Sequence, residues 1–317
     1  MKEALLYKKL KGNSVQCGLC YRRCLIKEGH RGYCLSRLNM GGTLYSLIYG
    51  VISAIEATPI EDKPLIHFHP GSRCLSVGTF GCNFRCKGCQ NHELSWGTDE
   101  LDSLAKLAID ARWLQTTEQD VNYNGFQYLT PEELVQKAFE LDCEGIAFTF
   151  NEPTIWLEYV MDVGKVAKNR DLYTVYVTNS WLSPEHLDVL GPYIDAMALD
   201  IKSMEDDYYE ELCNVKSAVS KVLQTCVYAF KKHDIYVETR TCIVPGYNED
   251  PALLAQIAAW IKDNLGKDSV WHILKFFPKH QLQGIPPTPE ESLYAAQSVG
   301  KEIGLRNINI VSDKSCD

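Results

Sequence analysis

The chain has 317 residues, 45% of them hydrophobic, with 41 acidic and 32 basic side chains and a formal net charge of −9, which is typical of a globular protein with one large domain and an appendage. No basic patch is evident, which disfavours a nucleic-acid partner, and no apolar run has the roughly 18 residues of a membrane span or resembles a signal peptide. The 13 cysteines, an odd number, fit poorly with a secreted disulfide framework, so we expect a protein of the reducing cytoplasm.

Residues 1–73 are rich in cysteine and glycine, and we expect them to form a separate metal-binding module. Cys17, Cys20, Cys24 and Cys34 follow the spacing C-x2-C-x3-C-x9-C, a strong metal-site pattern in a cytosolic protein. Tetrahedral zinc would stabilise a module that is too small to fold alone. A fully ligated auxiliary [4Fe–4S] cluster would instead serve electron transfer. Both interpretations stay open, and zinc is preferred because a structural role demands less.

Two histidines end this module. His67 and His69 lie two residues apart in an extended run and would face the same way. A metal pair is one interpretation, but two ligands rarely make a site, so two ordinary packed histidines are preferred. The thiols outside the two cysteine motifs lie mostly in apolar patterns and are expected to be buried: Cys74, Cys143, Cys213, Cys226 and Cys242, with Cys316 incidental near the end of the chain.

A loop with three cysteines follows a short apolar run at 74–80, which reads as a buried strand. Cys82, Cys86 and Cys89 have the spacing C-x3-C-x2-C. Three thiolates bind three irons of a [4Fe–4S] cube and leave the fourth iron open, and an open coordination position is a reaction site. A structural zinc site would more often show two separated C-x2-C pairs, and a disulfide framework is not expected in this compartment.

Residues 91–129 form a long polar insertion after the loop, with scattered aromatics. Long ordered loops at a barrel mouth are usually functional, and aromatic side chains often anchor interfaces. A substrate entrance and simple packing onto the domain are weighted equally. The aromatic residues concerned are Trp96, Trp113, Tyr123, Phe126 and Tyr128.

From residue 74 to residue 317, β-rich runs alternate with helical patterns, and we expect one large domain. Helix starts are indicated at Thr130-Pro131, Ser183-Pro184 and Thr288-Pro289. Repeated β–α units predict a parallel sheet, which right-handed crossovers would curl into a partial or full (β/α) barrel. The predicted strands are 74–80, 145–150, 172–179, 196–202, 235–244, 270–277 and 307–311.

Polar groups stand where these strands end, the place where a barrel gathers its active site. Each has an ordinary alternative: a helix N-terminus for Asn151-Glu152-Pro153, a cap for Thr178-Asn179, a surface ion pair for Asp200 and Lys202, and a satisfied core residue for His272. Arg240, which precedes a Pro-Gly turn, could bind a carboxylate. Asp200 and Lys202 share one strand face, and such a buried pair needs a partner or ligand.

In this order, the motifs resemble the radical SAM enzymes, and within them the pyruvate formate-lyase activating enzyme group. The motifs are Gly-Cys82-Asn-Phe-Arg-Cys86-x-x-Cys89, Asn151-Glu-Pro, Thr178-Asn, Asp200-Ile-Lys, Arg240-x-x-x-Val-Pro-Gly and His272-x-x-x-Phe-x-Pro. The resemblance implies an incomplete (β/α)6 barrel, a [4Fe–4S] cluster on the three cysteines, and S-adenosylmethionine (SAM) on the open iron. It implies SAM contacts from Asn151, Glu152, Thr178, Asn179, Asp200, Lys202, Arg240 and His272.

The N-terminal half resembles the radical SAM member of the AmmeMemoRadiSam system, through the Cys17–Cys34 cluster and the segment Lys63-Pro-Leu-Ile-His-Phe-His-Pro-Gly-Ser72. That resemblance implies Memo-like and AMMECR1-like partners and an electron donor such as flavodoxin or ferredoxin. The expected function is reductive cleavage of SAM to a 5′-deoxyadenosyl radical that abstracts hydrogen from an unidentified substrate, with a protein or peptide considered. Activation of a glycyl radical enzyme is one alternative, and a non-catalytic iron–sulfur or zinc electron-transfer scaffold is the other.

Overall fold

The structure, a computed structural model, describes residues 1–109 and 127–312. Its centre is a sheet of eight strands in the order β16–β15–β14–β13–β12–β11–β9–β8. Neighbouring strands run parallel from β9 to β16, and β8 (Ala54–Pro59) joins the edge antiparallel to β9. The parallel strands are β9 (Arg73–Gly78), β11 (Gly145–Phe148), β12 (Tyr173–Thr178), β13 (Ala196–Asp200), β14 (Tyr236–Ile243), β15 (Val270–Lys275) and β16 (Asn307–Val311).

Each of the seven strands predicted from the sequence overlaps one of these parallel strands, so the predicted α/β fold with a parallel sheet is confirmed. The strands were recognisable because their residues are buried on both faces, as β11 and β12 are throughout. β16 and β8 stand at opposite edges of the sheet, which is therefore open, and the parallel part has one strand more than a (β/α)6 barrel.

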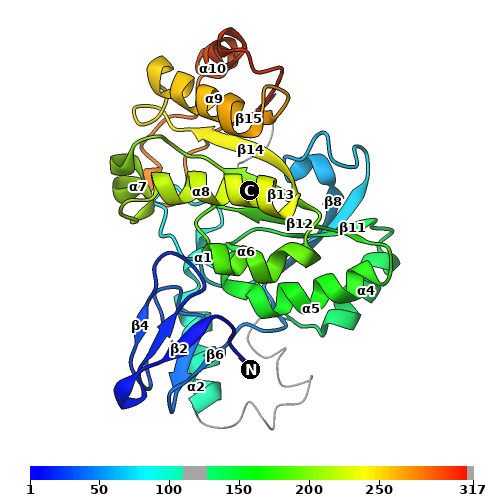
Figure 1. The fold of residues 1–317 in the computed structure, drawn as a ribbon, viewed down its shortest axis with the longest axis vertical. Helices are drawn as coiled ribbons and strands as arrows, with labels where there is room; N and C mark the ends of the chain where they lie inside the picture. The colour runs from blue at the N-terminus through cyan, green and yellow to red at the C-terminus, as the bar shows by residue number, and fades with distance from the viewer. Residues whose placement is uncertain (110–126, 313–317) are drawn as a thin grey trace.

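Helices connect the parallel strands, and Figure 1 shows α4, α5, α6 and α8 side by side across the sheet. Thr130 closes a capping box with Glu133, and the Ser183 hydroxyl accepts from the backbone N–H of His186, as the sequence predicts. Thr288 differs: its hydroxyl accepts from Phe276 N–H and donates to the Ile243 carbonyl, so it links strand ends instead of capping. The elements are α4 (Pro131–Glu140), η5 (Pro153–Trp156), α5 (Leu157–Lys168), α6 (Pro184–Leu190), η6 (Gly191–Tyr193), α7 (Asp206–Cys213), α8 (Val219–His233), α9 (Pro251–Leu265), η7 (His280–Leu282) and α10 (Glu290–Ile303).

The N-terminal region is built from two small sheets, with strand orders β2–β3–β4 and β1–β6–β5. The expected domain boundary at residue 73 falls inside the large sheet, because β8 pairs with β9 along its length. The buried Arg37 makes a bidentate ion pair with Glu158 of α5, at 2.7 Å for each nitrogen, and so fixes the module to the large domain. The elements are β1 (Lys2–Glu3), β2 (Tyr7–Lys9), η1 (Lys11–Asn13), β3 (Val15–Cys17), β4 (Leu25–Ile26), β5 (Arg37–Met40), β6 (Thr43–Ser46), β7 (Val51–Ile52) and η2 (Ile60–Asp62).

The insertion begins with α1 (His92–Trp96) and α2 (Thr98–Ile109) and ends with β10 (Gln127–Tyr128), which pairs with β7. Trp96 contacts His280 edge-on, with the ring centroids 4.6 Å apart. The Tyr128 ring covers Gly50, where a Cβ atom would come within 2.5 Å of it. Trp113, Tyr123 and Phe126 lie outside the described residues, as does Cys316.

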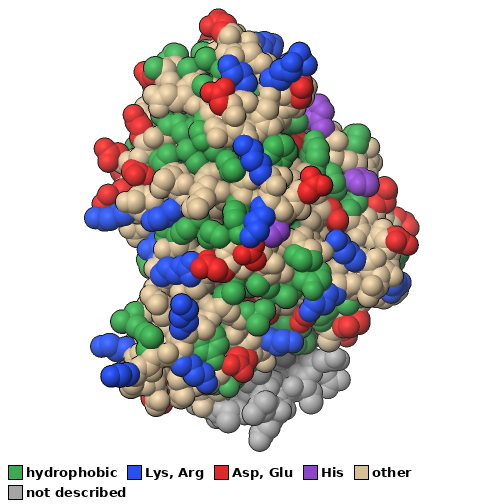
Figure 2. Space-filling model, viewed as in Figure 1, with side chains coloured by type: hydrophobic (Ala, Val, Ile, Leu, Met, Phe, Trp, Pro, Cys, Tyr) green, Lys and Arg blue, Asp and Glu red, His purple; other side chains and the backbone are tan. Residues whose placement is uncertain are grey.

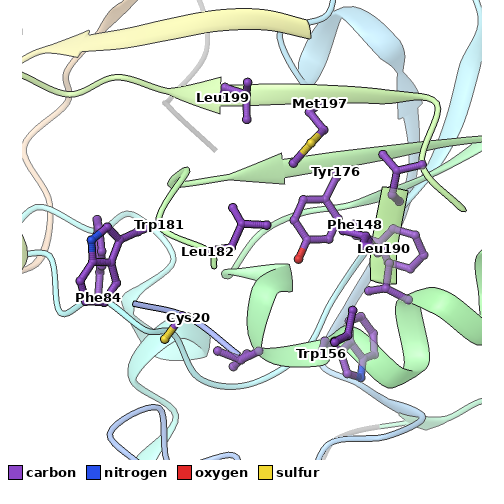
Figure 3. Close-up of a cluster of buried hydrophobic side chains, with 14 of the residues drawn as sticks. Cys20, Phe84, Phe148, Trp156, Tyr176, Trp181, Leu182, Leu190, Met197 and Leu199 are labelled. Atoms are coloured by element: carbon purple, nitrogen blue, oxygen red, sulfur yellow. The ribbon is translucent and has the colours of Figure 1, made fainter. Parts of the chain in front are cut away.

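One hydrophobic core joins the module to the large domain. Figure 3 shows Cys20 beside Phe84 and Trp181, while Phe148, Tyr176 and Trp156 continue the same cluster under the sheet. A β-bridge pairs Cys20 with Leu182. The module therefore rests on the cysteine loop and on the segment that follows β12. Within residues 1–109 and 127–312, no helix is long and apolar enough to cross a membrane.

Candidate functional site

The three-cysteine loop follows the end of β9, and the Asn151 side chain forms hydrogen bonds with its first residues. The Asn151 amide donates to the Gly81 carbonyl at 2.8 Å, and its oxygen accepts from Thr79 N–H at 3.1 Å. Gly81 has φ +96°, and a Cβ atom there would lie 2.7 Å from the Cys34 carbonyl oxygen, so the turn requires glycine. The Asn83 side chain is also hydrogen-bonded: its Oδ1 accepts from the side-chain amide of Asn179 at 2.7 Å.

Arg85 and the end of α7 fix the second half of the loop. The Arg85 guanidinium donates to the carbonyls of Cys82, Phe84, Ser95 and Tyr33. The backbone N–H groups of Arg85 and Lys87 donate to the Cys213 and Leu212 carbonyls, at 3.1 and 2.8 Å. The last carbonyls of a helix have no partner within it, so here the loop provides one. These hydrogen bonds connect the loop to α7 and to the segments around Tyr33 and Ser95.

A cavity of about 180 Å³ opens beside this loop at the C-terminal ends of β11, β12, β13 and β14. The three cysteines line it. The structure brings to the same cavity the side chains predicted at the strand ends, which are Asn151, Glu152, Thr178, Asn179, Asp200, Lys202 and Arg240. His272 is the predicted residue that does not line it.

The three thiols of the loop are poor acids in the protein alone. Burial raises the pKa of Cys82 well above its ordinary value and raises that of Cys89 to about 11. The pKa of Cys86 is raised first by a hydrogen bond with Cys213 and then by burial. The thiolate is the form that binds iron. A metal centre supplies the positive charge that makes these thiols thiolates, so the loop fits a metal cluster.

Glu152 links the segment that follows β11 to the end of β12. Its carboxylate accepts from Thr154 N–H and Thr154 Oγ1, from Thr178 Oγ1 at 2.8 Å, and from Asn179 N–H at 2.8 Å. Burial raises its pKa, and these hydrogen bonds oppose the rise. Glu152 and Thr178 are therefore occupied with positioning the strand ends, a role that the sequence did not reveal. Thr149, buried on the cavity wall, has a hydroxyl with no hydrogen-bond partner in the described part of the chain and is open to a ligand.

Asp200 is the centre of an ion triad on the cavity wall. Lys202 Nζ and Arg240 Nε each approach its carboxylate to 2.5 Å. Burial would raise the Asp200 pKa, but the two cations lower it below its ordinary value. Burial would likewise lower the Lys202 pKa, yet Asp200 and the nearby Cys86 hold it well above its ordinary value. The triad therefore keeps a net positive charge on this wall of the cavity, suited to a carboxylate or another anionic group.

The histidines lie elsewhere. His272 is fully buried on β15 and pairs with Glu238 through Nε2, although the sequence analysis expected it at the cofactor. Glu238 also accepts from the backbone N–H groups of Ile66 and His67, at 3.1 and 3.0 Å. His69 stacks on Tyr173 with ring centroids 4.7 Å apart. His67 and His69 thus meet different neighbours, and both remain exposed, which differs from the packed pair that the sequence analysis preferred.

Cys213, Cys242 and Tyr208 also line the cavity, and the sequence analysis missed them. Cys213 was expected to be a buried thiol, and it is buried, but beside Cys86. Tyr208 and Leu212 lie four residues apart on α7, so one face of this helix forms a cavity wall. The apolar periodicity of α7 was the available signal, but it does not tell which neighbour the helix meets.

The four cysteines of the N-terminal module surround a second, much smaller cavity of about 20 Å³. Burial raises the pKa of Cys17 to about 11, although Arg37 acts to lower it, and burial also raises the pKa of Cys20 and of Cys24. Arg37 lines the same cavity, and its buried Nε–H has no acceptor among the described residues. A buried guanidinium N–H next to thiols is a partner suited to thiolate sulfur, so the donor chemistry of this pocket suits thiolate ligands.

Within the described ranges 1–109 and 127–312, no group of three or more His, Cys, Asp or Glu side chains is arranged to hold a single metal ion. This holds for both cysteine clusters. The thiols of each cluster line one cavity, but they are not arranged around a single ion.

Comparison with known families identifies the superfamily of the chain. The model of the radical SAM superfamily matches residues 76–256, more than half of the chain. The chain belongs to the radical SAM superfamily. The family implies a [4Fe–4S] cluster and SAM as cofactors, and the matched residues contain the cysteine loop and every strand end on the main cavity up to β14.

Relatives extend the comparison. An uncharacterized protein of Methanocaldococcus jannaschii is 37% identical over 98% of this chain and 85% of its own length. The pyruvate formate-lyase-activating enzyme of Clostridium pasteurianum is 24% identical over 74% of this chain and 84% of its own length. A radical SAM methyltransferase from Sphaerobacter thermophilus shares the fold, with a TM-score of 0.56 and 14% identity over 79% of this chain and 69% of that one.

Proposed function

We propose that the protein is a radical SAM enzyme that acts by hydrogen abstraction on an unidentified substrate, with a protein or peptide as the candidate class. The observation that carries the proposal is the meeting of three loop thiols and polar strand ends from β11 to β14 in a single cavity. A scaffold that only transfers electrons would not need these polar side chains at the cavity. This weighs against the alternative of a non-catalytic iron–sulfur or zinc protein.

Cys82, Cys86 and Cys89 would hold the cluster, and the cavity wall would hold SAM. When bound, the two cofactors supply the reductive cleavage of SAM to methionine and a 5′-deoxyadenosyl radical that abstracts hydrogen from the substrate. Asn151, Asn179 and Arg85 keep the loop in one conformation. Such preorganisation lowers the cost of binding a charged cofactor.

The charged and the neutral side chains of the cavity have different proposed roles in binding SAM. Lys202 and Arg240 provide positive charge for the carboxylate of SAM, and Asp200 keeps both of them in place. Thr149 and the amides Asn151 and Asn179 offer polar groups for the ribose and the amino group. Glu152 positions Thr178 and Asn179 by accepting their hydrogen bonds. His272 is not assigned a cofactor contact, because it is paired with Glu238 away from the cavity.

Activation of a glycyl radical enzyme is the second candidate. It is favoured by the similarity to the pyruvate formate-lyase-activating enzyme, which covers 74% of this chain. Against this alternative, we propose that the N-terminal four-cysteine module, together with the insertion at 91–129, shapes a substrate entrance different from that of the glycyl-radical activators. The motif resemblance to the AmmeMemoRadiSam system supports Memo-like and AMMECR1-like partners as a further proposal, with flavodoxin or ferredoxin as the reductant.

The four-cysteine pocket is proposed as a second, independent metal site. Zinc would hold the module together, whereas a [4Fe–4S] cluster would add an electron carrier. Elemental analysis of anaerobically purified protein distinguishes the two. About four irons and one zinc per chain indicate zinc, and about eight irons without zinc indicate a cluster.

The proposed function is tested by reducing the reconstituted protein with dithionite and adding SAM. The expected results are a change in the EPR signal of the reduced cluster and the slow appearance of 5′-deoxyadenosine and methionine on chromatography. S-adenosylhomocysteine as the only product would instead indicate methyl transfer. An EPR signal that does not respond to SAM would contradict the proposal.

A further inference from the structure

Positive charge is concentrated in the N-terminal region of an otherwise acidic chain. Residues 1–53 contain nine Lys and Arg but only two Asp and Glu, which leaves 23 basic against 39 acidic residues in the remainder. Because the excess is spread over many short segments, the sequence analysis saw no basic patch. The fold gathers these side chains into one small module, so the expectation of no basic patch is corrected here.

Eight of the nine basic side chains of the module divide into two groups, and the ninth, Arg22, donates to the Asn83 and Asn214 carbonyls. Four of them pair with acidic groups of the large domain or the insertion: Lys2 with Asp162, Arg23 with Glu185, Arg31 with Asp102, and Arg37 with Glu158. Lys8, Lys9, Lys11 and Lys27 are exposed and make no ion pair within the described residues. The first group attaches the module to the rest of the chain, and the second group faces solvent.

Three lysines of the second group lie on or beside the outer face of the sheet β2–β3–β4. Lys8 stands on that face, Lys11 follows the end of β2, and Lys27 follows the end of β4. Lys9 belongs to the row of Val15 and Ile26 and donates to the Thr43 hydroxyl. Lys8, Gln16 and Leu25 lie in one row across the three strands and are all exposed, Leu25 at 65%. Figure 2 shows blue side chains next to green ones at the lower left, where Figure 1 labels β2 and β4. A leucine exposed among unpaired lysines is typical of a surface that a partner covers.

The opposite face of the same three strands meets the four-cysteine pocket. Alternate residues of a strand point to opposite faces, and Val15, Cys17 and Ile26 are buried beneath the sheet. The pocket that Cys17 lines is also lined by Asn83, the residue after Cys82 in the catalytic loop. Arg22 lines the pocket as well and donates to the Asn83 carbonyl at 3.1 Å. A protein seated on the outer face is therefore separated from the catalytic loop by one sheet and the pocket.

From this placement we propose that the outer face of β2–β3–β4, with Lys8, Lys11, Lys27 and Leu25, is the docking surface for an acidic one-electron donor protein. The inference rests on the proposed function, because that function requires a reductant. The donor gives up one electron to the loop site and is itself oxidised by one electron, and no bond is made or broken at the interface. Charge attraction guides the encounter, and a small contact suits a redox partner that must leave again.

The test uses the full reconstituted protein with flavodoxin as the acidic probe. The variant Lys8→Glu/Lys27→Glu reverses two charges on the proposed face, and Lys267→Glu/Lys301→Glu reverses two exposed lysines near α9 and α10 as a matched control. Both variants are exposed substitutions and should keep the melting temperature of the wild type. Binding of oxidised flavodoxin is measured by calorimetry at low and high salt, and SAM cleavage is measured with reduced flavodoxin and with dithionite.

We expect the Lys8→Glu/Lys27→Glu variant to lose about tenfold or more in flavodoxin affinity and in flavodoxin-driven rate, with a weaker dependence on salt. Its dithionite-driven rate should match that of the wild type, because dithionite needs no docking. Flavodoxin affinity equal to that of the control variant would overturn the proposal. Loss of binding to a test RNA with unchanged flavodoxin affinity would also overturn it and would mark a nucleic-acid surface. Failure of the proposed function shows separately, as wild-type protein that does not cleave SAM with dithionite.

Discussion

The two cysteine clusters of this chain place the same kind of side chain in opposite surroundings. Three thiols of the loop stand beside a cavity of about 180 Å³ with charged and amide groups on its walls. Four thiols of the module enclose a cavity of about 20 Å³, with Arg37 as their buried charged neighbour. A closed set of ligands suits structure or electron storage, whereas an incomplete set beside a roomy polar cavity suits chemistry. The comparison teaches that ligand number and free space, rather than cysteine content, distinguish the two roles.

The strongest way to break this comparison is to remove a loop thiol. Cys82→Ala should lose the SAM-responsive EPR signal and reduce SAM cleavage to background, because a cluster with two protein ligands is not retained at the site. The matched control is Cys143→Ala, a buried thiol that does not line the cavity, and it should keep the signal. If the triple alanine variant of Cys82, Cys86 and Cys89 still shows a SAM-responsive cluster, the catalytic assignment fails.

Removing thiols of the module should have a different consequence. Cys17→Ser/Cys20→Ser should lose the second metal and lower the melting temperature, because structural metal binding is coupled to folding. The loop cluster should still respond to SAM in the fraction that folds. Elemental analysis and thermal unfolding provide the measurements. Unchanged metal content in this variant would remove the second site from the account, and loss of both metals would show that the two sites are not independent.

Breaking the ion triad on the cavity wall should change the stability of the protein, a smaller effect than the loss of a metal site. Asp200→Asn leaves the buried Arg240 and the partly buried Lys202 without the Asp200 carboxylate, which should lower the free energy of unfolding by roughly 3 kcal/mol. The exposed pair partner Asp268, substituted as Asp268→Asn, should change it by less than about 0.5 kcal/mol. Chemical denaturation of both variants measures the difference. An equal effect of the two substitutions would show that the triad carries no special energy.

The same triad predicts a pH dependence. The Asp200 pKa is lower in the folded protein than its ordinary 3.8, because Arg240 and Lys202 outweigh the effect of burial. Its contribution to stability is therefore fully present above pH 3.8 and is lost as the pH falls through the lower folded pKa. Asp200→Asn should flatten the stability profile in this acid range only. A profile that stays parallel to that of the wild type would contradict the assigned pKa direction.

Features of the fold that depend on neighbouring residues in the sequence could be predicted, whereas features that depend on tertiary contacts could not. The seven parallel strands, the capping at Thr130 and Ser183, and the three-cysteine loop are local patterns, and all of them were predicted. The short strands of the N-terminal module and β10 were not predicted. Thr288 showed the same local signal as a cap but found better partners in two strand ends. Tertiary contacts, which no short window contains, decided that case.

The candidate site shows the same division. Strand-end residues could be named because parallel strands end at one edge of the sheet. The direction in which His272 points could not, since a strand presents alternate faces and the buried partner Glu238 is 34 residues away. The position of Cys213 beside Cys86 depends on where α7 packs. The basic face depends on the pairing of β2, β3 and β4 into one sheet. Each is a property of the assembled fold.

Cys213 allows the most detailed test of the difference between the three-cysteine loop and the four-cysteine module. It is a thiol beside the loop that belongs to neither cysteine motif. Its hydrogen bond with Cys86 is the largest cause of the raised Cys86 pKa. When Cys86 is a thiolate, the Cys213 S–H becomes the donor. A donor to a cluster thiolate stabilises the more negative, reduced state and so raises the reduction potential.

Cys213→Ala should therefore lower the potential of the loop cluster. A hydrogen bond worth about 1 kcal/mol corresponds to a shift on the order of 40 mV for a one-electron couple. An EPR-monitored redox titration measures the shift, with Cys226→Ala, a buried thiol outside the cavity, as the control. The cluster should keep its iron content and its response to SAM, because Cys213 is not assigned as a ligand. Loss of iron would make Cys213 a fourth ligand, and the loop would then resemble the closed module site. An unchanged potential would show that the Cys213 thiol only fills space against Cys86.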